Sequence, residues 1–139
     1  MKNEDTGGFA AGSGRDFLLS VTPLIHDMDR RVRQVLEILR AEWRRAWRIE
    51  DLAEQVGLRP SRLAHLFRAN AQTTIRDYVR ERRLVAAAER IASTCERISV
   101  ISYDVGFQDV SNFNHAFKKR FGMSPRQYRD AQDARLYSN

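Results

Sequence analysis

The sequence is poor in the features that would place it in several common protein classes. It has one cysteine, Cys95, which excludes an internal disulfide and a cysteine-based metal cluster and fits a reducing compartment. It has no run of about 18 or more apolar residues that could span a bilayer, and its N-terminus lacks the charged and then apolar plan of a signal peptide. We therefore expect a soluble cytoplasmic protein that makes no membrane contact.

The sequence also lacks the residue patterns of an active site. It contains no carboxylate cluster, no nucleophile paired with a base and no phosphate-binding loop. We therefore predict a protein that is not an enzyme and that holds no cofactor and no metal.

Charge is distributed unevenly along the chain. Residues 1–29 carry two basic and five acidic side chains, whereas residues 30–130 carry 21 basic and 12 acidic ones, a net charge of +9. A compact basic region is typical of proteins that bind a polyanion such as nucleic acid. Because arginine-rich helices are also common in proteins that bind none, charge alone leaves the partner open.

The strongest pattern is an internal repeat of about thirty positions. A shift of 49 residues aligns Leu52-Ala53 with Ile101-Ser102 and Val56-Gly57 with Val105-Gly106. After one inserted residue the shift becomes 50, and the matched pairs are His65 and His115, Phe67 and Phe117, Arg68 and Lys118, Thr74 and Ser124, Arg76 and Arg126, and Tyr78 and Tyr128. Such agreement indicates one supersecondary unit that occurs twice.

Each copy meets the requirements of a helix-turn-helix. A small residue, Ala53 or Ser102, lets two helices approach closely, and Gly57 or Gly106 supplies the left-handed turn conformation. In the second copy, Phe113, Phe117 and Phe121 recur every four residues and are predicted to point inward. The opposite faces carry side chains that can read bases or contact phosphate: Ser61, Arg62, His65 and Arg68 in the first copy, and Ser111, Asn114, His115 and Lys118 in the second.

Apolar spacing predicts an all-α fold of about seven helices, with two helix-turn-helix subdomains joined by a long central helix and no strand after residue 29. Residues 1–28 are predicted to be a flexible tail or the remnant of a preceding region, and their apolar stretch 17–25 could be a strand or an extended arm. The domain is predicted over 29–131, followed by a C-terminal tail at 132–139. Within it we expect a first amphipathic helix from Asp29 whose apolar stripe includes Trp43, a helix-turn-helix at about 49–70, a linker helix at about 74–93 and a second helix-turn-helix at about 98–121. Trp43, Trp47, Tyr78 and Tyr128 are predicted to be core residues.

Residues 31–130 resemble the DNA-binding domain of the AraC/XylS family of bacterial transcription regulators. The resemblance depends on Leu52-Ala53-Glu54-Gln55-Val56-Gly57-Leu58, on Ser61-Arg62-Leu63-Ala64-His65-Leu66-Phe67 and above all on residues 101–128, including Asp104-Val105-Gly106-Phe107 and Phe117-Lys118-Lys119-Arg120-Phe121-Gly122. It implies seven helices and the insertion of both recognition helices into successive major grooves on one face of double-stranded DNA.

The resemblance also implies which residues bind DNA. They are Ser61, Arg62, Ala64, His65 and Arg68 in the first copy, and Ser111, Asn112, Asn114, His115, Lys118 and Lys119 in the second. The two histidines are expected to contact bases; a metal site shared by them is excluded, because they would lie about one DNA helical turn apart, roughly 34 Å. Arg62 could pair with guanine, Ser61, Ser111 and Asn114 could read a base or a phosphate, and Asn112, Lys118, Lys119 and Arg68 are expected on phosphates. Thr74 and Ser124 are predicted to cap the helices that follow, where exposed N–H groups could bind phosphate.

The sequence departs from the family pattern at a few positions. Gln72 stands where the family has glycine, so the first recognition helix is expected to end without the left-handed glycine cap that Gly122 gives the second. Ser102 replaces an alanine. Arg48 and Arg97 stand where capping hydroxyls are usual, and we expect the first copy to be the less stable one.

The resemblance implies a sequence-specific transcription regulator, more often an activator in this family, with RNA polymerase as a further partner. It would act in the bacterial cytoplasm, associated with the nucleoid, as a monomer or weak dimer. Three alternatives stay open: the chain is the DNA-binding module of a larger effector-sensing regulator, it is the DNA-binding module of a DNA repair enzyme, or it engages only a protein partner. A protein groove would favour apolar anchors on the recognition helices, whereas these faces are polar.

Overall fold

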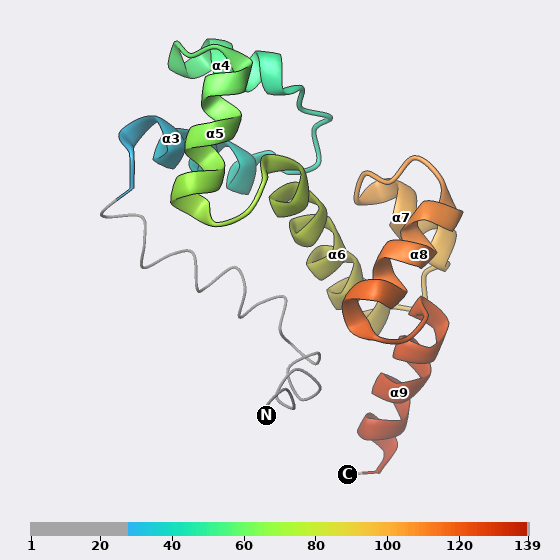
Figure 1. Ribbon diagram of the computed structural model, residues 1–139. Helices are drawn as coiled ribbons and strands as arrows, with labels where there is room; N and C mark the ends of the chain where they lie inside the picture. Colours follow the sequence, from blue (N-terminus) through green and yellow to red (C-terminus); the bar gives the residue numbers. More distant parts are fainter. Residues whose placement is uncertain (1–27, 139) are drawn as a thin grey trace. The chain divides into compact units, whose positions relative to one another are not determined.

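The computed structural model describes residues 28–138, which form seven α-helices and no β-strand (Figure 1). The helices are α3 (Arg30–Ala41), α4 (Ile49–Val56), α5 (Pro60–Ala71), α6 (Ile75–Ser93), α7 (Ile98–Asp104), α8 (Val110–Phe121) and α9 (Pro125–Tyr137). The prediction of an all-α fold with about seven helices is confirmed. The predicted tail at 1–28 and its apolar stretch 17–25 lie outside the described residues, except for Met28.

The described residues divide into two compact units, and the boundary between Arg82 and Arg83 falls within the long helix α6. The N-terminal unit, residues 28–82, contains α3, α4, α5 and the first half of α6. The C-terminal unit, residues 83–138, contains the second half of α6 with α7, α8 and α9. Each unit therefore holds one helix-turn-helix and part of the helix that connects them.

The core of the N-terminal unit lies among its four helices. Its fully buried side chains are Val32, Val35, Leu36 and Leu39 of α3, Leu52 of α4, and Leu63 and Phe67 of α5. The ring of Tyr78 on α6 contacts Phe67 edge-on, with 6.3 Å between centroids. The first three turns of α3 therefore bury the apolar stripe that the sequence predicted.

Trp43 is the exception to that stripe. Helix α3 begins at the cap residue Asp29, whose side chain accepts a hydrogen bond from the Arg31 N–H, and it ends at Ala41, before Trp43. Trp43 and Trp47 lie in the α3–α4 loop and are only half-buried, although the indole of Trp47 packs against the core and donates to the carbonyl of Glu42 (3.1 Å). The prediction that both tryptophans are core residues is therefore wrong for Trp43, because the helix that would have turned it inward has already ended.

An aromatic column fills the C-terminal unit. Phe113, Phe117 and Phe121 on α8 follow one another every four residues, and neighbouring rings lie 5.6 Å and 4.6 Å apart. Tyr128 of α9 meets Phe117 edge-on at 5.4 Å, although it is itself only partly buried. Four-residue spacing places the three phenylalanines on one face of α8, as predicted.

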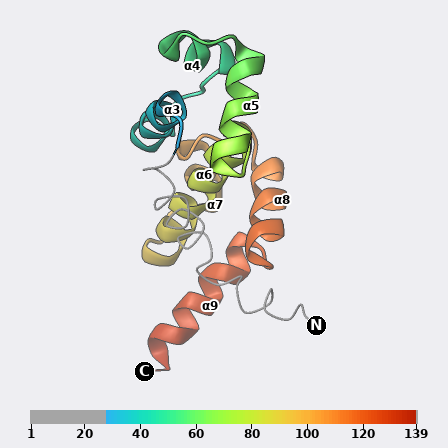
Figure 2. The same ribbon diagram turned by 60° about the vertical axis from the view of Figure 1, so that its left-hand side comes forward.

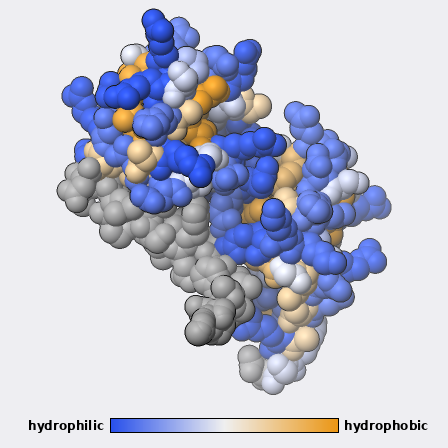
Figure 3. Space-filling view, viewed as in Figure 1, coloured by the Kyte–Doolittle hydropathy of each residue, from blue (hydrophilic) through white to orange (hydrophobic). Residues whose placement is uncertain are grey.

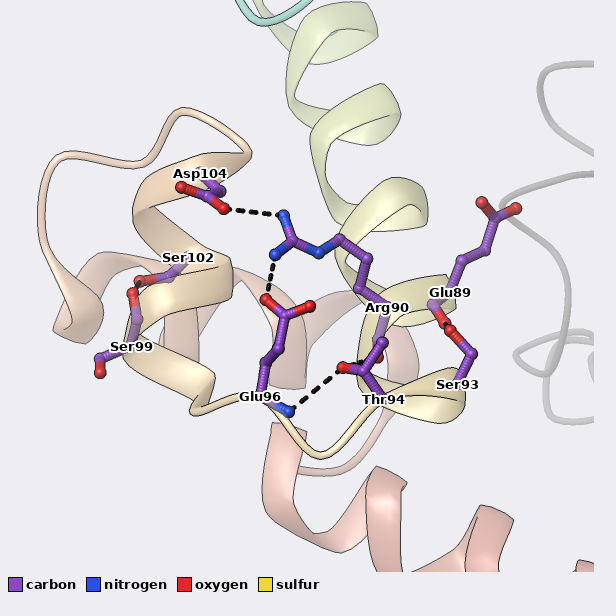
Figure 4. Close-up of polar contacts among 8 residues, drawn as sticks. All are labelled: Glu89, Arg90, Ser93, Thr94, Glu96, Ser99, Ser102 and Asp104. Carbon is purple, nitrogen blue, oxygen red and sulfur yellow. Dashed lines mark hydrogen bonds and ion pairs between the residues drawn. The ribbon is translucent and has the colours of Figure 1, made fainter.

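The junction between α6 and α7 is held by polar contacts (Figure 4). The guanidinium of Arg90 on α6 donates to the carboxylate of Glu96 in the connecting loop and lies 3.1 Å from the carboxylate of Asp104 at the end of α7. The hydroxyl of Thr94 donates to the Arg90 carbonyl and accepts from the Glu96 N–H. These contacts fix α7 against the second half of α6.

The last helix is longer than the sequence predicted. Ser124 and Gln127 form a capping box at the start of α9, and the helix continues to Tyr137, through most of the predicted tail at 132–139. Residues 131–137 contain no glycine or proline and include two alanines, a glutamine, an arginine and a leucine, all of which favour a helix. Most of this extension is exposed and projects beyond α8 (Figure 2).

Candidate nucleic-acid interface

The two helix-turn-helix turns have the same backbone hydrogen bond. In the first, the Leu58 N–H donates to the carbonyl of Ala53 (2.9 Å), and in the second, the Phe107 N–H donates to the carbonyl of Ser102 (3.0 Å). The glycine before each donor has a positive φ, 72° at Gly57 and 111° at Gly106. These are the positions that the repeat predicted for the turn, so the sequence repeat is also a repeat of geometry.

The small residue in each first helix is buried, as the close helix approach requires. Ala53 and Ser102 are both almost without exposed surface. The buried hydroxyl of Ser102 donates to the Ser99 carbonyl at 2.8 Å, so the change from alanine leaves no unsatisfied polar group there.

Burial of the two second helices agrees residue by residue. Every position from 61 to 74 has the same burial class as the position 50 residues later, from 111 to 124. Leu63, Phe67 and Ala71 are buried on α5 where Phe113, Phe117 and Phe121 are buried on α8. Equivalent positions on the two helices therefore face equivalent surroundings, and the outward face is presented twice.

All eleven residues predicted to bind DNA lie on these outward faces. Ser61, Arg62, Ala64, His65 and Arg68 are exposed on α5, and Ser111, Asn112, Asn114, His115, Lys118 and Lys119 are exposed on α8. Neither helix contains an aspartate or glutamate. The side of the molecule in Figure 3 is largely hydrophilic, and its apolar residues form smaller patches. These faces present hydrogen-bonding and cationic groups without a nearby carboxylate on the same helix.

Asn112 differs from the other predicted residues because its amide has a partner. Asp109, the cap residue of α8, accepts from the backbone N–H of Asn112 (2.7 Å) and from its side-chain Nδ2 (3.0 Å). Among the described residues, the side chains of Arg62, His65, Asn114 and His115 make no such bond. Their polar atoms are available to a ligand.

The ends of the two recognition helices are unequal. Helix α8 has a side-chain cap from Asp109 and ends at Gly122 with φ 81°, whereas the cap residue of α5, Arg59, makes no side-chain cap bond. Gln72 nevertheless ends α5 in the left-handed conformation, with φ 63°. The expectation that α5 ends without a left-handed cap is therefore wrong for the backbone, because Gln72 adopts the left-handed conformation without being a glycine, at a cost for a residue with a Cβ atom. Arg48 and Arg97 also make no side-chain cap bond.

The predicted caps after the recognition helices are confirmed. The Thr74 hydroxyl accepts from the Asp77 N–H (3.0 Å) at the start of α6. Ser124 accepts from the Gln127 N–H (3.1 Å), and Gln127 accepts in return from the Ser124 N–H (2.9 Å).

Arg59 is a candidate that the sequence prediction did not include. It stands exposed immediately before α5, and its side chain has no hydrogen bond or ion pair with a described residue. The signal for Arg59 in the sequence was its position directly before Pro60, which begins the helix. A phosphate is attracted to the positive end of the helix dipole, and a cation at that end can contact it.

Residues 28–138 contain no group of three or more histidine, cysteine or acidic side chains placed to hold a metal ion. None of the helices described is both long enough and apolar enough to cross a membrane.

Comparison with known proteins gives matches over the repeat. A family model described as a helix-turn-helix domain matches residues 52–131. The chain is 32% identical over 98 residues to the Msm operon regulatory protein of Streptococcus mutans serotype c, covering 70% of this chain and 35% of that protein. It is 32% identical over 81 residues to the regulatory protein SoxS of Escherichia coli K12, covering 58% of this chain and 76% of SoxS. The chain thus spans about a third of the Msm regulator but three quarters of SoxS.

The fold also matches a solved structure, the DNA-binding domain of the global transcriptional factor AdpA in complex with a target DNA. The TM-score is 0.72 at 17% identity, and the match covers 80% of this chain and all of that one. At this identity the likeness establishes a shared fold.

Proposed function

Because the chain belongs to the AraC/XylS family of helix-turn-helix regulators, we propose that it binds double-stranded DNA sequence-specifically and regulates transcription. The observation that carries the proposal is the outward face of α5 and its repeat on α8, both exposed and free of carboxylates. An α-helix fits the major groove of B-DNA, where each base pair presents a distinct pattern of donors and acceptors. Two such helices would read two half-sites.

The residues divide by the kind of contact that their chemistry allows. Ser61, His65, Ser111, Asn114 and His115 offer donors and acceptors to base edges, and Arg62 could form a bidentate pair with guanine. Arg68, Lys118 and Lys119 are long cations suited to phosphates, and Arg59 joins them. The Asp109 carboxylate beside Asn112 makes that residue a weaker phosphate ligand than the lysines.

Both recognition helices belong to one chain. Since α5 and α8 present different side chains at several equivalent positions, one chain can bind an asymmetric site as a monomer, with its helices in successive major grooves. In the bacterial cytoplasm, at the nucleoid, the bound chain would contact RNA polymerase and act as an activator. The matching relatives named above are regulatory proteins, which supports regulation over catalysis.

A competition experiment tests the proposal. Labelled duplexes from a random library are titrated with the chain at physiological salt, and selected sequences are compared with random DNA. Preferred binding to a defined sequence is the expected result; equal binding to all duplexes would overturn the proposal.

Variants then test readout by named residues. Arg62→Ala and His115→Ala are expected to cost about 1 to 3 kcal/mol on the selected site and little on random DNA. Arg135→Ala, which removes an exposed cation from the last turn of α9, is the matched control and should change neither. An equal loss on selected and random DNA would assign Arg62 and His115 to phosphates.

A further inference from the structure

The repeat allows the two DNA half-sites to be compared before either is known. Resting on the proposed function, we infer that both half-sites share the bases read by the serine and histidine common to α5 and α8, and differ at the base facing Ala64 or Asn114. Asn114 reads an adenine in the half-site of α8, and Ala64 leaves the equivalent position in the half-site of α5 without polar readout.

Positions on α5 and α8 that are 50 residues apart are structurally equivalent. Burial from 61 to 74 repeats from 111 to 124, and the backbone turn before each helix has the same hydrogen bond. A side chain on α5 and its counterpart 50 residues later therefore leave their helices in the same direction relative to the rest of the helix-turn-helix. A side chain on α5 and its counterpart on α8 should therefore contact equivalent positions in their own half-sites.

Two of the exposed positions carry the same residue on α5 and on α8. Ser61 matches Ser111 and His65 matches His115, and all four are exposed without a hydrogen bond to a described residue. Identical donors and acceptors at equivalent positions select the same base edges. The two half-sites should therefore have these bases in common.

The two helices differ at position 64 of α5 and the equivalent position 114 of α8. Ala64 offers only a methyl group, which can contact the methyl of thymine but cannot form a hydrogen bond. Asn114 offers an amide with both a donor and an acceptor, which is the pairing that fits the N6 and N7 edge of adenine. Both side chains are exposed, so each can contact bases in the major groove.

Helix α8 carries a second exposed amide, that of Asn112. Asn112 lies two residues before Asn114 and could offer the same chemistry. Its Nδ2 donates to Asp109 at 3.0 Å, so its amide is oriented by the helix cap. Asn112 therefore does not compete with Asn114 for the adenine edge.

The experiment is selection of binding sites by the wild-type chain and three variants. The wild type should select two half-sites with common bases, one of which has an additional adenine. Asn114→Ala should lose that adenine preference, by roughly 5- to 150-fold in relative affinity, and leave the other positions unchanged. Ala64→Asn should gain an adenine preference in the other half-site, and Arg135→Ala, which lies outside both recognition helices, should change no base preference.

The outcomes separate this inference from the proposed function. Specific binding in which the half-sites share no bases, or in which Asn114→Ala keeps the adenine preference, would overturn the inference and leave the proposed function in place. Absence of any selected sequence in the wild type would overturn both. Far-ultraviolet circular dichroism melts confirm that the exposed-site variants are folded, and the gain expected from Ala64→Asn cannot arise from unfolding.

Discussion

Nη1 of Arg90 lies 3.1 Å from Oδ2 of Asp104, an ion pair that spans from the linker helix α6 to the last residue of α7. The other terminal nitrogen of the same guanidinium bonds to Glu96, so one side chain bridges two carboxylates (Figure 4). Hydrogen bonding to Glu96 first, and then to Asp104, raises the pKa of Arg90 above its ordinary value. The guanidinium therefore stays charged at every working pH.

We expect Arg90→Ala to lower the free energy of unfolding of the C-terminal unit by about 1 kcal/mol, since exposed ion pairs contribute little but a bridged network contributes more. Arg90→Lys should recover only part of the loss. It keeps the positive charge, but an ammonium group cannot present two separated donors in a fixed plane. Urea denaturation measures both. Glu96→Gln and Asp104→Asn complete a double-mutant cycle, and an absence of coupling to either carboxylate would contradict the network.

The left-handed cap of α5 predicts a stabilising substitution. Gln72 has φ 63°, a conformation that costs a residue with a Cβ roughly 1 to 2 kcal/mol, whereas glycine adopts it freely at some cost in unfolded-chain entropy. Gln72→Gly should raise the free energy of unfolding by about 0.5 to 1 kcal/mol.

Gly122 is the matched control for Gln72, because a Cβ built there would meet no atom within 4 Å. Gly122→Gln should therefore destabilise by conformational strain alone, by about the amount that Gln72→Gly gains. Thermal and urea unfolding of the two variants would measure the pair. A loss of stability in Gln72→Gly would show that the glutamine side chain has a stabilising contact that outweighs its backbone strain.

The repeat, the turn glycines and the apolar spacing were sufficient to predict seven helices and both outward faces. The apolar spacing and the turns depend on neighbours within about four residues, and the repeat shows the same local pattern twice. Features that depend on particular side-chain contacts were missed. The end of α3 before Trp43 coincides with the bond from Trp47 to Glu42, and the Arg90 network joins residues on separate helices. The amide of Asn112 was within reach of sequence reasoning, since a cap residue three positions before it is a local pattern.

The two turn glycines should respond differently to alanine. A Cβ at Gly57 would meet no atom within 4 Å, whereas one at Gly106 would lie 2.8 Å from Nε of Arg83. Arg83 is held there by a bond from its Nη1 to the Gly106 carbonyl (3.3 Å), and burial lowers the pKa of its guanidinium. Gly57→Ala should cost about 1 kcal/mol from the left-handed backbone, and Gly106→Ala about 1 to 3 kcal/mol, because its φ of 111° lies further from the left-handed region open to alanine and because Arg83 must also move.

Unfolding of the two alanine variants under the same conditions checks this order. Arg83→Ala combined with Gly106→Ala should cost less than the sum of the two single changes, since the clash is absent once the side chain is shortened. Additive losses in the Arg83→Ala and Gly106→Ala double variant would mean that the Arg83 side chain moves aside without cost.

Contacts between cationic side chains and phosphates make DNA binding depend on salt. Each phosphate that a cation neutralises contributes about −0.9 to the slope of log affinity against log salt, because condensed counterions are released. Arg68 and Lys118 occupy equivalent exposed positions on α5 and α8, so Arg68→Ala and Lys118→Ala should each reduce the magnitude of the slope by about 1. Both variants should weaken selected and random DNA alike, and Arg135→Ala should leave the slope unchanged although it removes the same charge. Fluorescence anisotropy titrations over a series of salt concentrations measure these slopes; a slope that falls equally in all three variants would mean that net charge, rather than phosphate contact by the recognition helices, governs the affinity.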